Sequence, residues 1–181
     1  ATYADRAKPA LKTLQGAAEP VVVVGHSQAS SIAGLVADGG PVDLLVHLCP
    51  RMGTFGRPDG MPSPVQPGLE FPAERPDGTS VWDHEVAVKT IYRRLPTDTA
   101  RSFARRMRPM AMPPDDYPLA AHPDVPTALV YAAHDEIFTP DFERFMAREL
   151  LGVEPVELAT GHFPMLEDPP GLAALLDRLT P

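Results

Sequence analysis

Residues 21–30 read VVVVGHSQAS, and this stretch decides the fold. Four β-branched valines without a polar residue between them predict a strand that is buried on both faces, as in a parallel sheet. The character of the sequence changes at Ser27, after which small and apolar residues at helical spacing run to about residue 40. The sequence therefore predicts a strand that turns directly into a helix at Ser27.

Strands and helices alternate on both sides of this stretch. The 21–24 strand, its helix and the next apolar run form a β-α-β unit, whose crossover should be right-handed. Alternation of this kind predicts an α/β fold with a doubly wound, mainly parallel sheet of about four strands. The other expected elements are helices over residues 3–14, 141–151 and 168–179 and strands over residues 42–49, 127–132 and 153–159.

Proline and glycine interrupt this alternation in the middle of the chain. Eleven of the thirty residues from 51 to 80 are Pro or Gly, which precludes long regular elements there. Two helices are expected after it, over residues 82–95 and 97–107. We therefore divide the chain into three segments, which are core residues 1–50, a cap or lid insertion over residues 51–122, and core residues 123–181.

Length and charge limit the classes of partner. The 181 residues fit one domain, or one domain with an insertion. Twenty-four acidic against sixteen basic residues give a net charge of −8, so we expect no nucleic acid and no membrane as partner. A single cysteine, Cys49, excludes an internal disulfide. The N-terminus lacks the pattern of a signal peptide, and we expect a cytoplasmic location.

Ser27 is the first of three residues with chemical potential that follow predicted strands. It lies in Gly25-x-Ser27-x-Ala29, an imperfect form of the nucleophile elbow, in which small neighbours let strand and helix approach closely. The turn also points the Gln28 N–H and the positive end of the helix at one place, as a developing oxyanion requires. The alternative is that Ser27 only caps the helix.

Asp135 and His162 follow the ends of later strands, where doubly wound sheets place catalytic groups. A serine hydroxyl needs a base, and the base needs a group that orients it. His162, in a glycine-containing loop, is the candidate base, and Asp135 is the candidate orienting carboxylate. The alternatives are a loop or capping histidine and an aspartate that only forms an Asx-turn.

Other candidates carry less weight. His26 adjoins Ser27, but we expect its side chain to point elsewhere on a tight turn. Cys49 ends a strand and is expected to be a small core residue. Without an H-E-x-x-H motif or Cys/His spacing we expect no metal site, and there is no P-loop and no G-x-G-x-x-G motif for a nucleotide.

The motifs VVVVGHSQAS, AAHDEIFTPDF and GHFPMLEDPPGLAALL resemble the α/β-hydrolase superfamily, most of all its branch of plant methylesterases and hydroxynitrile lyases. The order Ser27, Asp135, His162 is also the superfamily's order. The resemblance implies an α/β-hydrolase fold with a cap and hydrolysis of a small carboxylic ester through an acyl-enzyme on Ser27, without a cofactor. Hydroxynitrile lyases of this branch carry a lysine directly after the catalytic histidine. Phe163 stands there in this chain, so cyanohydrin cleavage is the less favoured alternative.

The sequence departs from this branch in two ways. The elbow continues as Ala29-Ser30, where the branch has two glycines. The chain also starts at the helix before the nucleophile strand, so the resemblance implies an N-terminally incomplete fold with an exposed sheet edge. A second hypothesis follows, which is a non-catalytic module that self-associates or binds a partner chain through that edge. In the cap, Trp82, Phe103 and Met107 would line an acyl pocket or form the cap's own core, and we favour the core.

Overall fold

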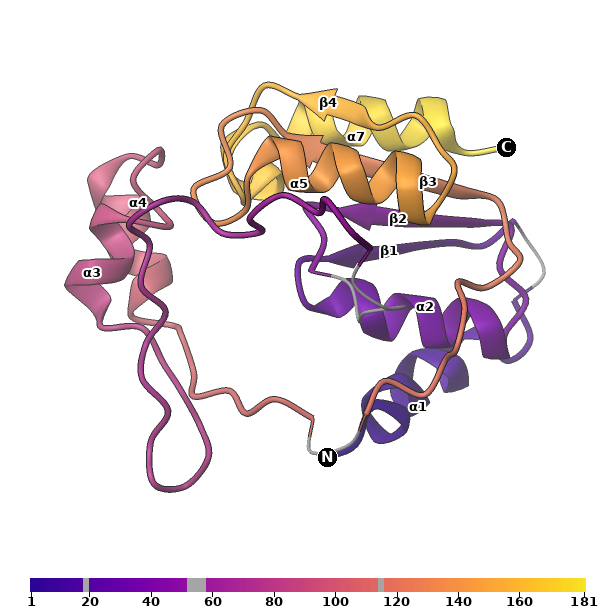
Figure 1. Ribbon diagram of the computed structural model, residues 1–181, viewed down its shortest axis with the longest axis horizontal. Coiled ribbons are helices and arrows are strands. Elements are labelled where there is room, and N and C mark those ends of the chain that lie inside the picture. The colour runs from indigo at the N-terminus through magenta and orange to yellow at the C-terminus, as the bar shows by residue number, and fades with distance from the viewer. Residues whose placement is uncertain (18–19, 52–57, 114–115) are drawn as a thin grey trace.

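The computed structural model describes residues 1–17, 20–51, 58–113 and 116–181 (Figure 1). Its strands form one parallel sheet in the order β1-β2-β3-β4. The strands are β1 (Val22–His26), β2 (Leu44–Leu48), β3 (Thr127–Ala132) and β4 (Val156–Leu158). The helices are α1 (Tyr3–Leu14), α2 (Ala29–Gly39), α3 (His84–Lys89), α4 (Thr97–Ala104), α5 (Pro140–Phe145), α6 (Pro164–Glu167) and α7 (Pro169–Leu179), with a π-helix η1 (Met146–Leu150) directly after α5.

Helices cover both faces of the sheet because alternate strand residues point to opposite sides. On one face Val46 of β2 and Val130 of β3 pack with Leu172 of α7. On the other face Leu45 packs under α2, and Leu129 packs against α5 and η1. All five residues of β2 are buried, as its unbroken apolar run predicts. The predicted α/β class with a doubly wound parallel sheet is therefore confirmed.

A proline shortens the last strand of the sheet. The strand that was expected over residues 153–159 is only β4, which begins directly after Pro155. Proline has no N–H to donate to a neighbouring strand, so pairing starts behind it. The short helix α6 after His162 was not anticipated. Among the described residues no helix combines the length and the apolar character that crossing a bilayer would require.

The cap helices α3 and α4 are shorter than the sequence periodicity indicates. The Asp83 side chain accepts hydrogen bonds from the N–H groups of Glu85 and Val86, which fixes the start of α3. Buried residues of both helices pack with Ile137 and Phe138, which follow β3. Figure 1 shows α3 and α4 at one end of the sheet, beyond the carboxyl ends of the strands. The boundaries of the three segments remain our proposal.

Glu143 on α5 is an uncompensated acid in the core. It is fully buried, and neither carboxyl oxygen has a hydrogen-bond partner among the described residues. Burial, and then the charge of Asp135, raise the pKa of Glu143 well above its ordinary value. The folded protein therefore binds this proton more tightly than the unfolded chain does. Its contribution to stability is fully present below the ordinary pKa of 4.5 and decreases as the pH rises toward the folded-state pKa.

We expect Glu143→Met to increase the free energy of unfolding at pH 8 by about 1–3 kcal/mol, because an unbranched apolar side chain replaces an unpaired buried acid. The gain should be smaller at pH 5, which lies only slightly above the ordinary pKa of 4.5, so that little of the stability linked to this proton has yet been lost. Urea unfolding followed by circular dichroism at both pH values measures the difference. Glu149→Met, at an exposed position of η1, is the control and should change stability by less than about 0.5 kcal/mol. An equal gain at both pH values would contradict the argument.

Candidate active site

Ser27 occupies the turn between β1 and α2 with a φ of 52°, in the left-handed region that few non-glycine residues adopt. Its N–H donates to the Leu48 carbonyl at 2.9 Å, and its own carbonyl accepts from the Arg51 N–H at 3.0 Å. The end of β2 therefore holds the strained turn in place. This is the sharp strand-to-helix turn that a nucleophile elbow needs.

The close approach of β1 and α2 depends on Gly25. A Cβ atom at this position would lie 2.6 Å from the Ala33 Cβ and 2.7 Å from the Ser30 Cα. The backbone of α2 cannot yield as a flexible side chain could. The small residue that the elbow pattern requires at Gly25 thus has a direct steric reason, although Ala29 replaces the second glycine.

We expect Gly25→Ala to destabilise the fold by about 1–3 kcal/mol, because the added methyl group forces α2 away from β1. Gly39→Ala is the matched control at the far end of α2. There the contacts of the added Cβ are Leu11 methyl groups, the nearest at 3.3 Å, and a flexible side chain can move. The control should be neutral or slightly stabilising. Thermal unfolding of both variants tests this, and equal melting temperatures would contradict it.

Gln28, not Ser27, is the N-cap residue of α2, and no side chain caps this helix. The alternative role of Ser27 as a helix cap is therefore wrong. Among the described residues no backbone acceptor lies within hydrogen-bonding geometry of the Gln28 N–H. The N–H stands at the positive end of a helix of eleven residues, where an oxyanion would be stabilised.

Asp135 and His162 are hydrogen-bonded to one another. The distance from His162 Nδ1 to Asp135 Oδ2 is 2.7 Å, and both side chains are buried. The other carboxylate oxygen of Asp135 accepts from the N–H groups of Ile137 at 2.6 Å and Phe138 at 2.8 Å. Asp135 therefore forms the Asx-type turn and orients the imidazole at the same time, so the two readings of this residue are compatible.

Two glutamates hold the backbone of the histidine loop. Glu136 accepts from the His162 N–H at 2.9 Å, and Glu167 accepts from the Gly161 N–H at 2.9 Å. Arg94 of the cap donates to Glu167 at 2.8 Å and lies 4.0 Å from Glu136. Burial raises the pKa of Glu136. Sequence reasoning missed this support, and the only signal was the acidic pair at positions 135 and 136.

The expectation for His26 is wrong, because its side chain does not point away from the site. His26 Nε2 donates to the His162 carbonyl oxygen at 2.7 Å, and the two ring centroids are 4.9 Å apart. Since β1 continues through His26, the side chain is carried to the strand end, beside the histidine loop. Burial, together with the nearby His162, lowers the pKa of His26 to about 4, so the ring is neutral at pH 7.

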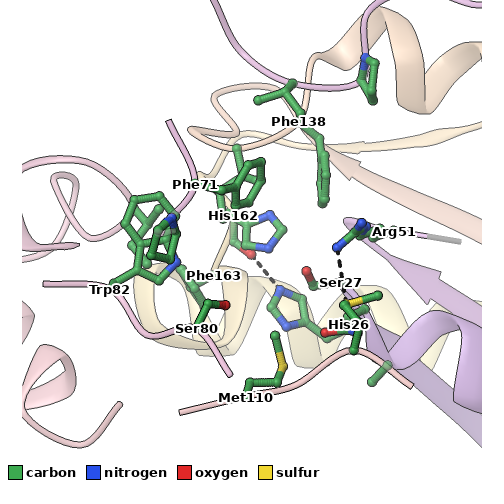
Figure 2. Close-up of a pocket in the computed structure, with 18 of the residues that line it drawn as sticks. His26, Ser27, Arg51, Phe71, Ser80, Trp82, Met110, Phe138, His162 and Phe163 are labelled. Carbon is green, nitrogen blue, oxygen red and sulfur yellow. Dashed lines mark hydrogen bonds between the residues drawn. The ribbon is translucent and has the colours of Figure 1, made fainter. Parts of the chain in front are cut away.

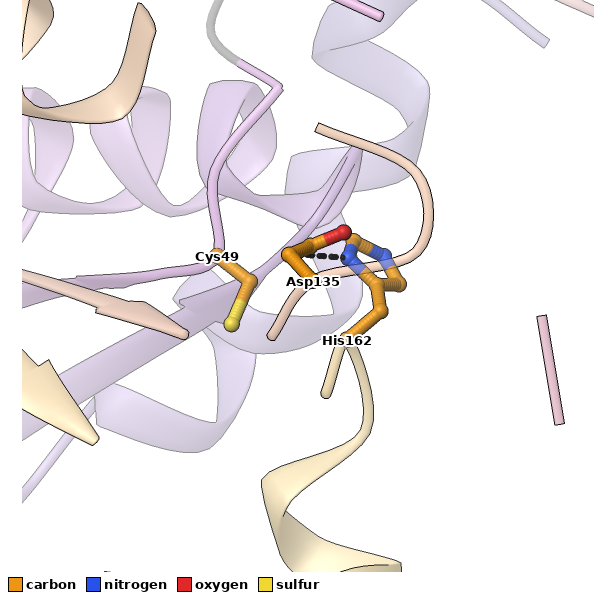
Figure 3. Close-up of side chains that lie close together, drawn as sticks. All are labelled: Cys49, Asp135 and His162. Carbon is orange, nitrogen blue, oxygen red and sulfur yellow. Dashed lines mark hydrogen bonds and ion pairs between the residues drawn. The ribbon is translucent and has the colours of Figure 1, made fainter. Parts of the chain in front are cut away.

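Cys49 lies close to this pair (Figure 3). Each of the residues Cys49, Asp135 and His162 offers one atom that could bind a metal. These three atoms lie within 4.8 Å of one another, and all three residues are buried. Burial raises the pKa of the Cys49 thiol well above its ordinary value, which disfavours the thiolate that would bind a metal or attack a substrate. The imidazole and carboxylate already bind each other. This donor set fits a histidine–aspartate pair better than a metal, and the absence of a metal site stays a prediction.

Ser27 and His162 line one cavity of about 790 Å³, and Figure 2 shows them on its wall together with His26. Most of the other lining side chains are apolar. Trp82 and Met107 line this cavity and also pack against the buried residues of α3 and α4, which we call the cap cluster. Both expected roles, lining a pocket and forming the core of the cap, therefore apply to them. Phe103 is not one of the described residues that line the cavity, and it packs against the cap cluster only.

Comparison with known proteins identifies the family and the fold. The sequence profile of the Alpha/beta hydrolase family matches residues 1–175. No curated protein matches the chain. The solved structure of polyneuridine aldehyde esterase is similar, with a TM-score of 0.74 and 18% identity over 98% of this chain and 79% of that chain.

Two further structures share the fold at low identity. A methylesterase from Arabidopsis has a TM-score of 0.73 and 18% identity over 98% of this chain and 77% of its own. An extracellular α/β-hydrolase from a Paenibacillus species has a TM-score of 0.71 and 15% identity over 99% of this chain and 80% of its own. Because the family profile spans nearly the whole chain, this protein belongs to the alpha/beta hydrolase family and is an enzyme of the hydrolase class.

Proposed function

We propose that this protein hydrolyses a carboxylic ester through an acyl-enzyme on Ser27, with His162 as general base and acid and Asp135 as its orienting partner. The observation that carries the proposal is the 2.7 Å bond between His162 and Asp135, on a histidine that lines the same cavity as Ser27. A strained serine turn at the mouth of a parallel sheet adds to it.

In this proposal each step of acyl transfer is assigned to one of these groups. His162 donates its Nδ1–H to Asp135, which leaves Nε2 without a proton and able to accept one from the Ser27 hydroxyl. The Ser27 oxygen then attacks the ester carbonyl, and the Gln28 N–H stabilises the oxyanion. His162 returns the proton to the leaving alcohol. A water molecule, deprotonated by His162 in turn, releases the acid and restores the serine.

The cavity supports an ester that is larger than the small ester expected from sequence. Its volume of about 790 Å³ lies within the range of pockets that enclose drug-sized ligands. Five of the seven methionines of the chain line it, and their flexible thioethers adapt to varied apolar shapes. The lining methionines are Met61, Met107, Met110, Met112 and Met146. The names of the similar structures, an esterase and a methylesterase, also favour ester chemistry.

A fluorophosphonate probe tests the nucleophile directly. We expect one covalent adduct per chain, located on the peptide that contains Ser27 by mass spectrometry. Preincubation with a slow ester substrate should delay labelling. An intact mass that stays unchanged after long incubation would count against the proposal, as would an adduct on another serine, such as Ser80 in the same cavity.

The exposed sheet edge supports the second candidate function, an interaction module. Among the described residues β1 pairs with β2 alone, and Val24 at this edge is 42% exposed. Sedimentation velocity should then reveal association that increases with concentration and weakens in Val24→Lys. Val86→Lys, at an equally exposed valine of α3, is the control and should leave association unchanged. A monomer at all concentrations would contradict this candidate.

A further inference from the structure

One corner of the cavity beside Ser27 carries polar groups that acyl transfer does not use. The Arg51 backbone is fixed there by its 3.0 Å hydrogen bond to the Ser27 carbonyl. The Arg51 guanidinium lies 3.7 Å from the thioether sulfur of Met112, and the side-chain amide nitrogen of Gln28 lies 2.8 Å from the same sulfur (Figure 2 shows the Arg51 contact). A thioether is a weak hydrogen-bond acceptor, so the Arg51 guanidinium and the Gln28 amide both donate to a weak acceptor.

No described carboxylate neutralises this corner. Arg51 forms no ion pair within the described part of the chain, and neither does Arg108, a second arginine of the cavity lining. None of the described lining residues is Asp or Glu. A positive corner beside an apolar cavity, in a chain of net charge −8, therefore has hydrogen-bond donors that no described acid meets.

We propose that this corner binds a carboxylate of the substrate, so that the preferred ester is apolar and carries a carboxylate group besides the ester. The inference deepens the proposed function and rests on it for the ester bond. The Arg51 guanidinium matches the two oxygens of a carboxylate, and the Gln28 amide supplies a further N–H. Both donors would then bond to a charged carboxylate oxygen in place of the Met112 sulfur, and the flexible methionine side chain can move aside.

The size of the effect follows from the hydrogen bonds to the carboxylate. Hydrogen bonds to a charged group contribute enough to change an equilibrium by about 10-fold to 100-fold. These hydrogen bonds, and not burial, determine the size of the effect, because Arg51 itself is exposed to solvent. We therefore expect a preference of about this size for a carboxylated ester over a neutral ester with the same carbon skeleton.

Two matched pairs of esters test the preference on the acyl side and on the alcohol side. The first pair is 4-nitrophenyl hexanoate and the 4-nitrophenyl monoester of hexanedioic acid. The second pair is 4-ethylphenyl hexanoate and 4-(carboxymethyl)phenyl hexanoate, and their hydrolysis is measured by proton release. In at least one pair kcat/KM should be about 10-fold to 100-fold higher for the carboxylated ester at pH 7.5. A ratio at or below one in both pairs would overturn the inference, while turnover of the neutral esters would leave the proposed function intact.

Variants locate the preference at Arg51. Arg51→Met keeps an unbranched, flexible side chain and removes its charge, and the carboxylated-to-neutral ratio should fall to about one. Arg101→Met is the control, since Arg101 is an exposed arginine of α4 that does not line the cavity, and the ratio should stay as in the wild type. A preference that survives Arg51→Met would overturn the assignment to this corner.

A binding measurement keeps the inference testable if no ester is turned over. Isothermal titration calorimetry compares hexanoic anilide with the monoanilide of hexanedioic acid, neither of which requires hydrolysis. The carboxylated anilide should bind about 10-fold to 100-fold more tightly, and Arg51→Met should abolish the difference. Equal affinity of the two anilides would overturn the carboxylate site. If the carboxylated anilide binds more tightly but the fluorophosphonate does not label Ser27, the proposed function is rejected and the carboxylate site is retained.

Discussion

Ser27→Ala should reduce kcat for a 4-nitrophenyl ester by about 10⁶-fold. In the proposed mechanism the Ser27 oxygen forms the acyl-enzyme, and alanine supplies neither this oxygen nor the proton that His162 would accept from it. Alanine has the same Cβ in the same strained backbone, at φ 52°, and the fold should be retained. Steady-state kinetics with protein purified free of host esterases measures the loss.

Ser102→Ala is the control for this experiment. Ser102 lies on α4 outside the cavity, and its variant should keep the wild-type rate. Circular dichroism and thermal unfolding should be alike for both variants and the wild type. Should Ser27→Ala retain a tenth of the activity with the fold intact, Ser27 is not the nucleophile and the acyl-enzyme is abandoned.

Asp135→Asn should lower kcat by about 10⁴-fold without unfolding the protein. The asparagine oxygen can still accept from the Ile137 and Phe138 N–H groups, so the turn after β3 persists. The new NH₂ group then faces His162 Nδ1 and can only donate to it. This forces the imidazole proton onto Nε2, which can no longer accept the proton of Ser27.

Asp141→Asn makes the same chemical change six positions along the chain. Its side chain is 77% exposed and pairs only with Arg144 among the described ion pairs, so activity should be unchanged. The two variants therefore separate the tautomer effect from a general effect of lost charge. A loss below about tenfold in Asp135→Asn would show that the carboxylate does not set the tautomer of His162.

Local sequence patterns predicted much of the fold because they reflect short-range physics. The strand over residues 127–132 coincides with β3, and the helix after Ser27 coincides with α2. An apolar β-branched run and a set of small residues at helical spacing leave little choice at these positions. The prediction was less accurate for β4, where the apolar run included Pro155 and Val153.

Position along the chain also predicted the three proposed catalytic residues, since each follows a strand of a parallel sheet. It did not predict the groups that support them. His26 was expected to point away, and the roles of Glu136 and Arg51 were not foreseen. The hydrogen bond between Glu136 and His162, for example, joins residues that are 26 positions apart, and no local pattern encodes such a pairing.

The sequence by itself determined the α/β class, the parallel sheet, the serine turn and the order of the candidate triad, because each follows from short local patterns and their order along the chain. Only the tertiary structure decided which side chains share the cavity, that Asp135 reaches His162, and that Arg51 faces a thioether instead of a carboxylate. These contacts depend on how strand ends and loops converge, and packing of the whole chain determines that convergence.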